Sequence, residues 1–257
     1  MIEIYPYQVL PKTRSLFDRD MPASLRCWAV LDGNAAGKIY TDGAFSPTWG
    51  LVQEAGFGSI YLGGSLDAPI LRRLVAELGK SGDVLVGLWP DDERINLFPP
   101  NPDYDGVALD FTDRPIGQGL DSYLPVPAGC DVRRMDRPLF ERCLGRDLYV
   151  AAFESVAKAL EKGFGLCLMR EDEILCEAFA GPAAMGVIEI GTTTHEPYRG
   201  RGYATITCAH LIQACEELGY QTYWNCAKQN LASAAVARKL GYRTERDYRL
   251  LAWFKSA

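Results

Sequence analysis

The hexapeptide Arg199-Gly200-Arg201-Gly202-Tyr203-Ala204 has the residue types that a binding site for a diphosphate requires. It follows an apolar run at 186–193 and opens a segment, 200–218, whose apolar residues recur at helical spacing. The first turn of a helix leaves N–H groups unpaired and carries partial positive charge, so an anion there accepts several hydrogen bonds. Small residues allow a close approach to the backbone, and two arginines add charge. The hexapeptide alone also fits a glycine-rich surface turn, because short glycine motifs recur by chance.

Two glutamates on consecutive apolar segments are candidates for acid–base chemistry. Glu189 lies within Val187-Ile188-Glu189-Ile190, and Glu177 lies in the preceding apolar segment, 174–179. Glu189 is our candidate general base, acting directly or through water, and the alternative is an outward-facing strand residue or an internal salt bridge. Glu177 is the rival base. If the two lie close together across neighbouring strands, one of them holds a proton more readily.

The pattern Arg-x-x-Gly-x-Ala at Arg199, Gly202 and Ala204 resembles the coenzyme A motif of the GNAT superfamily, (Arg/Gln)-x-x-Gly-x-(Gly/Ala). Downstream, the segment from Asn230 to Ser233 leading to 239–242 is similar to that superfamily's second block. The resemblance covers about residues 130–257, and two blocks at this separation are more specific than either alone.

A narrower resemblance is to the acetyltransferase family named for zwittermicin A self-resistance. Trp224, Cys226 and the segment 237–242 carry it in the second half. In the first half, 30–33 and 37–42 resemble that family's N-terminal region. By this resemblance the N-terminal half is itself a diverged GNAT-like unit without the coenzyme motif, and the family's name suggests an antibiotic-like acceptor.

The resemblance implies an N-acetyltransferase that moves acetyl from acetyl-CoA to the amine of a small-molecule acceptor by direct attack. The residues expected to contact the coenzyme are Ile190, Thr192, Arg199, Gly200, Arg201, Gly202, Tyr203, Ala204, Thr205, Asn230 and Ser233. For Asn230 and Ser233 the alternative is plain helix capping. Two other functions stay open: a non-catalytic acyl-CoA sensor, and an acetyltransferase that acts on protein lysines or N-termini.

The acid that protonates the leaving thiolate is not evident in the sequence. Many members of the superfamily carry a tyrosine seven residues after the asparagine of the second block, and this chain has Ala237 there. The candidate substitutes are Tyr198, Tyr203, Cys226 and Ser233. The thiolate can also leave without an enzymatic acid.

The pattern of elements predicts an α/β fold with a mixed sheet, organised as two domains. Prolines and glycines interrupt the periodicity between about Asp113 and Ala128, so we place an N-terminal α/β domain at 1–125 and a GNAT domain at 126–257. In the first half we expect strands at 27–31, 59–62, 84–89 and 106–111, and a helix capped by Ser65. In the second half we expect helices at 146–162, 200–218 and 230–241, and strands at 164–169, 174–179, 186–193, 222–224 and 248–254.

Composition narrows the possible partners. The net charge of −6 argues against nucleic acid, because a duplex-binding protein needs a basic face. No apolar run is long enough to cross a membrane, and the N-terminus lacks the features of a signal peptide. Eight scattered cysteines without a Cys-x-x-Cys pair predict a reduced, cytoplasmic protein. Two histidines without ligand spacing predict no metal site.

Overall fold

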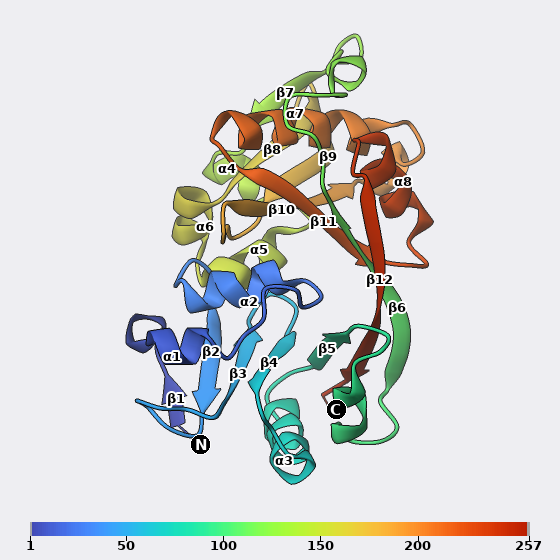
Figure 1. The fold of residues 1–257 in the computed structure, drawn as a ribbon. Helices are drawn as coiled ribbons and strands as arrows, with labels where there is room; N and C mark the ends of the chain where they lie inside the picture. The colour runs from blue at the N-terminus through green and yellow to red at the C-terminus, as the bar shows by residue number, and fades with distance from the viewer. Residues whose placement is uncertain (1, 256–257) are drawn as a thin grey trace. The chain divides into compact units, whose positions relative to one another are not determined.

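The computed structural model describes residues 2–255 and has a mixed α/β fold, as the sequence predicted (Figure 1). It divides into two compact units. Unit 1 comprises 1–109, 227–229 and 247–257, and unit 2 comprises 110–226 and 230–246. The predicted division into domains 1–125 and 126–257 stays a prediction.

Unit 1 is built on a four-stranded antiparallel sheet in the order β1-β2-β3-β4, comprising Ile2–Ile4, Gly37–Thr41, Trp49–Glu54 and Ile60–Gly64. Helix α2 (Ser24–Leu31) packs against β3, and α3 (Ala68–Gly79) follows β4. Strand β5 (Val84–Leu88) comes next and pairs antiparallel with the end of β12. The apolar face of α3 packs against these strands, because Leu71, Leu74 and Val75 recur at helical spacing and are all buried.

Unit 2 contains a run of antiparallel strands: β7 (Asp131–Arg134), β8 (Phe164–Arg170), β9 (Glu173–Ala180) and β10 (Val187–Thr194). The expected hairpin is confirmed, since β8 and β9 pair directly across the turn at 171–172. After β10, the chain forms α7 (Tyr203–Glu217) and returns as β11 (Gln221–Ala227), which lies parallel to β10. Helix α8 (Leu231–Lys239) and strand β12 (Thr244–Trp253) complete the chain.

Each face of the unit 2 sheet is covered by helices. Helix α7 contacts β8, β9 and β10 on one face. The other face carries α4 (Arg137–Phe140), α5 (Arg146–Phe153) and α6 (Val156–Lys162), whose apolar side chains form a cluster with Phe179 of β9. In this cluster the Tyr149 ring stacks on Phe179, with ring centroids 4.0 Å apart. The strand between the two helical layers is therefore held from both sides.

Strands β6 (Tyr104–Thr112) and β12 each contribute residues to both units. The hydrogen-bonded order of the larger sheet is β5-β12-β6-β11-β10-β9-β8-β7. The remaining short helices are α1 (Pro11–Arg14) and the 3-10 turns Pro6–Gln8, Glu93–Leu97, Asp121–Tyr123 and Glu196–Tyr198.

Three expectations about elements were wrong. The run Cys27–Leu31 is not a strand but the end of α2, because a short apolar run that is buried all round has no period that separates helix from strand. The helix expected at 146–162 is two helices, separated where Glu154 adopts φ +68° and Ser155 caps α6. Helix α3 is capped by Asp67 and not by Ser65.

Candidate active site

The turn before α7 adopts a conformation that favours glycine at two positions. Gly200 and Gly202 have φ values of +76° and +81°, in the left-handed region that side chains disfavour. A Cβ at either position would meet no other atom within 4 Å, so the backbone conformation is what favours glycine there. Among the described residues, no hydrogen bond joins the N–H groups of 200–205 to another group of the chain. The start of α7 therefore presents a row of donors that an anion can accept from.

The side chains of this segment divide into two sets. Arg199 and Arg201 are exposed, with Arg199 Nε 3.3 Å from the Thr194 carbonyl oxygen and the Arg201 guanidinium 5.9 Å from the centre of the Tyr198 ring. Tyr203 and Thr205 are buried, and the Tyr203 hydroxyl accepts a hydrogen bond from Arg170. Ala204 is half-buried against the apolar cluster below α7. Of the expected contacts, Tyr203, Ala204 and Thr205 can thus offer their backbone N–H groups, whereas the arginines can offer charge.

Beside this turn, strands β10 and β11 part. They pair in parallel only from Val187↔Gln221 to Glu189↔Tyr223. Beyond that pair β10 continues to Thr194, held by β9 alone, and β11 continues to Ala227. Ile190 is buried, and the Thr192 hydroxyl donates to the Glu177 carbonyl at 2.8 Å. These two residues can therefore meet a ligand through the backbone edge that faces the opening between the strands.

The second block forms the start of α8, where the capping interpretation is confirmed. The Asn230 side-chain oxygen Oδ1 accepts from the Ser233 N–H at 3.1 Å, and the Ser233 hydroxyl accepts from the Trp224 indole N–H at 3.0 Å. Ala237 is completely buried in the same helix. Burial raises the pKa of the Cys226 thiol, which disfavours the thiolate that a covalent mechanism needs.

Glu177 is completely buried on β9 and is held by the connection between α4 and α5. Its two carboxylate oxygens accept from the N–H groups of Leu144 (2.9 Å) and Gly145 (2.6 Å). His195 Nε2 lies 3.5 Å from the same carboxylate. A Cβ at Gly145 would lie 3.0 Å from Glu177 and 2.8 Å from Tyr149, so glycine permits this close approach.

Glu189 lies on the same face of the sheet as Glu177, but not next to it. Its register partner on β11 is Tyr223, and its carbonyl oxygen accepts from the Gly181 N–H, whereas Glu177 pairs with Thr193. Glu189 therefore lies four positions along β10, about 13 Å, from the residue that pairs with Glu177. The sequence left open whether the two glutamates lie close together across neighbouring strands, and the strand register places them apart. Glu189 is half-buried, at the last residue before the strands part.

A third acidic group lies beside the opening between β10 and β11, and the sequence analysis did not identify it. Asp110 on β6 is buried and accepts hydrogen bonds from the Tyr223 hydroxyl (2.5 Å) and the Asn225 amide (2.7 Å). The available signal was a charged residue inside the otherwise apolar segment 106–111. Because Tyr223 pairs with Glu189, the Asp110 cluster lies on the same face as Glu189.

Other site chemistries find no support in the described part of the chain. Residues 2–255 contain no group of three or more His, Cys, Asp or Glu side chains that could hold a metal ion. All eight cysteines are free thiols. No helix within these residues is both long and apolar enough to cross a membrane.

Comparison with known proteins identifies the family to which the chain belongs. Residues 112–251, more than half of the chain, match the family model described as GNAT acetyltransferase. The chain therefore belongs to the GNAT acetyltransferase family, and acyl transfer is the general activity that this membership supports.

Three similar proteins extend over nearly the whole chain. The uncharacterized N-acetyltransferase YdfB of Bacillus subtilis is 24% identical over 255 residues, covering 91% of this chain and 92% of the relative. A GCN5-related N-acetyltransferase-like protein from Streptococcus suis has a TM-score of 0.69 and 25% identity, covering 93% and 96% of the two chains. A tandem GNAT protein from the clavulanic acid biosynthesis pathway has a TM-score of 0.56 and 11% identity, covering 92% and 89%, and shows a shared fold.

Proposed function

We propose that the chain transfers an acetyl group from acetyl-CoA to the amine of a small-molecule acceptor. The observation that carries this proposal is the open N-terminus of α7 beside the parted strands β10 and β11. The N–H groups of 200–205 bind the donor's diphosphate, and Arg199 and Arg201 add positive charge. A cytoplasmic location and an acceptor of the antibiotic-like kind suggested by the zwittermicin-type resemblance belong to the same proposal.

The donor's thiol arm lies along the edge of β10 that β11 leaves unpaired. Ile190 and Thr192 take part through their backbone groups, because one side chain is buried and the other is hydrogen-bonded within the sheet. Asn230 and Ser233 are already engaged with the start of α8 and with Trp224. We therefore propose that these two residues fix the start of α8 beside the opening. Any contact with the coenzyme is made by their atoms that are not used in these hydrogen bonds.

Bound acetyl-CoA supplies a thioester that an amine can attack. The chain's own residues position the two reactants and transfer protons. Glu189 takes the proton from the amine, directly or through water, as the nitrogen–carbon bond forms and the carbon–sulfur bond breaks. The parted strands hold the two reactants in line, which is a large part of the rate gain when two molecules must meet. The departing thiolate takes its proton from solvent, since Ala237 occupies the position of the family's usual tyrosine.

Glu177 is the second candidate for the base, and its surroundings favour a different role. Both of its oxygens are hydrogen-bonded to main-chain N–H groups, and the carboxylate is completely buried. We propose that Glu177 holds the connection between α4 and α5, with His195 beside it, and that Glu189 carries the catalytic proton.

The test is a thiol-release assay with acetyl-CoA and a panel of amines, together with calorimetry of acetyl-CoA binding. We expect Glu189→Gln to lower kcat by at least about 100-fold, the usual scale for a general base, with the acetyl-CoA Kd within twofold. The matched control is Glu217→Gln, because Glu217 is exposed at the far end of α7. Full turnover in Glu189→Gln would remove the base assignment, and no binding at millimolar acetyl-CoA would remove the enzyme proposal.

A second candidate function is a non-catalytic acyl-CoA sensor, which the buried alanine at position 237 favours. It predicts donor binding without thiol release for any amine. A third candidate function is acetylation of proteins. An assay with radiolabelled acetyl-CoA distinguishes it, because the small-molecule proposal requires label on metabolites and none on macromolecules.

We also propose that the N-terminal half is a diverged GNAT-like unit. The fold shared with a tandem GNAT protein over 92% of this chain supports it. So does the order of elements, because unit 1 contains three antiparallel strands, a helix and a further strand, β2-β3-β4-α3-β5, as unit 2 does in β8-β9-β10-α7-β11.

A further inference from the structure

We propose that the donor cleft of unit 1 is closed by the unit's own side chains, so that the chain binds acyl-CoA only at the start of α7. The location at α7 rests on the proposed function. The closure of unit 1 rests on the residues of that unit alone.

Unit 1 also contains two parallel strands that separate, β4 and β5. Strands β4 and β5 meet in parallel at the bridge Ser59↔Leu85, as β10 and β11 meet from Val187↔Gln221. Beyond the bridge, β4 continues to Gly64 at the edge of one sheet and β5 continues to Leu88 at the edge of the other. The backbone therefore opens in unit 1 as it opens at the proposed donor site.

The helix that follows the opening is closed to an anion. The Asp67 carboxylate accepts from the Ile70 N–H at 2.8 Å, so a negative charge already occupies the N-terminus of α3. Pro69 in the first turn has no N–H to donate. A diphosphate there would lose donors and meet a like charge. At α7 the corresponding residue is Gly202, which brings no side chain.

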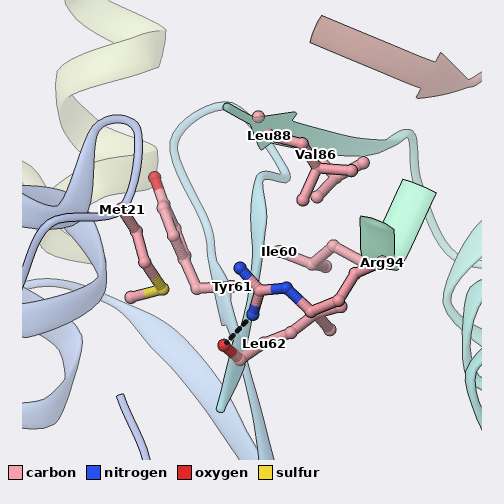
Figure 2. A pocket seen from close by; sticks show the side chains of 8 residues that line it. Met21, Ile60, Tyr61, Leu62, Val86, Leu88 and Arg94 are labelled. Carbon is pink, nitrogen blue, oxygen red and sulfur yellow. Dashed lines mark hydrogen bonds between the residues drawn. The ribbon is translucent and has the colours of Figure 1, made fainter. Parts of the chain in front are cut away.

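Arg94 occupies the opening itself. A small pocket between the two strands is lined by 60–62 of β4 and 86–88 of β5, with Met21 and Arg94 (Figure 2). The Arg94 guanidinium donates to the Leu62 carbonyl oxygen at 3.3 Å, as the dashed line in Figure 2 shows. Asp92 fixes the guanidinium through hydrogen bonds of 2.6 to 3.0 Å. Arg94 is thus hydrogen-bonded to the backbone of β4. The corresponding edge in unit 2 is the edge of β10 along which we propose that the thiol arm of the donor lies.

The closure can be tested on the full-length chain by hydrogen exchange with and without saturating acetyl-CoA. We expect the ligand to slow exchange in 188–206 and 221–227 and to leave 60–71 and 84–94 unchanged. Calorimetry should give one acetyl-CoA per chain. Slower exchange in 60–71, or two acetyl-CoA molecules per chain, would overturn the proposal.

A pair of charge reversals locates the binding independently. Arg199→Glu with Arg201→Glu should weaken acetyl-CoA binding at least 100-fold, whereas Arg72→Glu with Arg73→Glu, on the exposed side of α3, should change it less than twofold. Binding that survives the first pair and is lost with the second would place the donor in unit 1 and overturn the closure. A wild-type chain that binds no acetyl-CoA would defeat the proposed function, yet it would agree with a closed unit 1.

Discussion

Glu177 and Glu189 lie on one face of neighbouring strands, but the surroundings of their carboxylates differ. The Glu177 oxygens are hydrogen-bonded to the N–H groups of Leu144 and Gly145, so the residue joins β9 to the connection between α4 and α5. Glu189 is half-buried at the point where β10 loses β11. A conservative change at each position should therefore be felt in different measurements.

Glu177→Gln places an amide N–H₂ group where at least one backbone N–H now donates to an oxygen. We expect a loss of about 2 kcal/mol in the free energy of unfolding, since hydrogen bonds to a charged group contribute about 1.5–3 kcal/mol. Chemical denaturation at pH 7 measures it, with Glu217→Gln, at an exposed position, as the comparison, for which we expect a change below about 0.5 kcal/mol. Equal losses in the two variants would contradict the stabilising role of the Glu177 carboxylate.

Two buried tyrosine hydroxyls offer a matched pair for stability. The Tyr61 hydroxyl has no hydrogen-bond partner among the described residues, whereas the Tyr242 hydroxyl donates to the Thr222 hydroxyl at 2.9 Å. Tyr61→Phe should raise the free energy of unfolding by about 1 kcal/mol, because it removes an unsatisfied buried group. Tyr242→Phe should lower it by about 1 kcal/mol, because it leaves Thr222 without that partner. Destabilisation by Tyr61→Phe would indicate that the hydroxyl is satisfied.

At the scale of elements, α7 has a glycine with positive φ at each end. Gly202 precedes the helix at φ +81°, and Gly219 follows it at φ +85°, and neither is crowded. Alanine at either position should cost about 1 kcal/mol of stability from the left-handed backbone. Only Gly202→Ala should also weaken acetyl-CoA binding, measured by calorimetry, because it strains the turn that presents the N–H groups. Equal binding by both variants would argue against the site at the start of α7.

The Asp92–Arg94 contact in unit 1 should depend on pH in a defined direction. Burial raises the pKa of Asp92. Hydrogen bonds from the Arg94 side chain and N–H lower this pKa by more than burial raises it, so the pKa lies below its usual value. A carboxyl whose pKa is lowered by folding stabilises the fold above its unfolded pKa, and that contribution is lost as the pH falls through the folded pKa.

We therefore expect Asp92→Asn to destabilise the chain most near pH 7, by less than about 1 kcal/mol for this partly exposed pair. The difference should shrink as the pH falls below about 4. Denaturation curves at several pH values measure it, and Asp91→Asn, at an exposed neighbour, is the control. A difference that grows on acidification would contradict the assignment.

The elements that the sequence could predict are those with a clear period or a strong boundary residue. Asn230 has the geometry of a helix cap, and the glycine turn at 200–202 opens α7 near its expected start. The run at 27–31 carried no such signal. In the site, the long-range partners could not be predicted from the sequence. Glu177 accepts hydrogen bonds from backbone groups 33 and 32 residues before it, and Asp110 accepts one from Tyr223, which lies 113 residues after it. Such contacts depend on the sheet order, which no local pattern encodes.

At the scale of the whole molecule, the compact units are not contiguous in sequence. Unit 2 begins at Asp110 and ends at Arg246, and 247–257 belong to unit 1. Strand β6 lies between β12 and β11 in the larger sheet. Its residue Phe111 is completely buried, and Arg114 just beyond it is hydrogen-bonded to Leu240 and paired with Glu216 of α7.

A cut at the Pro- and Gly-rich segment should therefore damage unit 2, although composition favours a boundary there. We expect the fragment 126–257 to show no cooperative unfolding by circular dichroism, because it lacks 110–114 and so leaves the partners of Asp110 and Arg114 unsatisfied. The fragment 110–246 keeps those contacts and should unfold cooperatively, with acetyl-CoA raising its midpoint if it retains the donor site. Cooperative unfolding of 126–257 would show that 110–114 are dispensable and that the domain boundary does lie near residue 125.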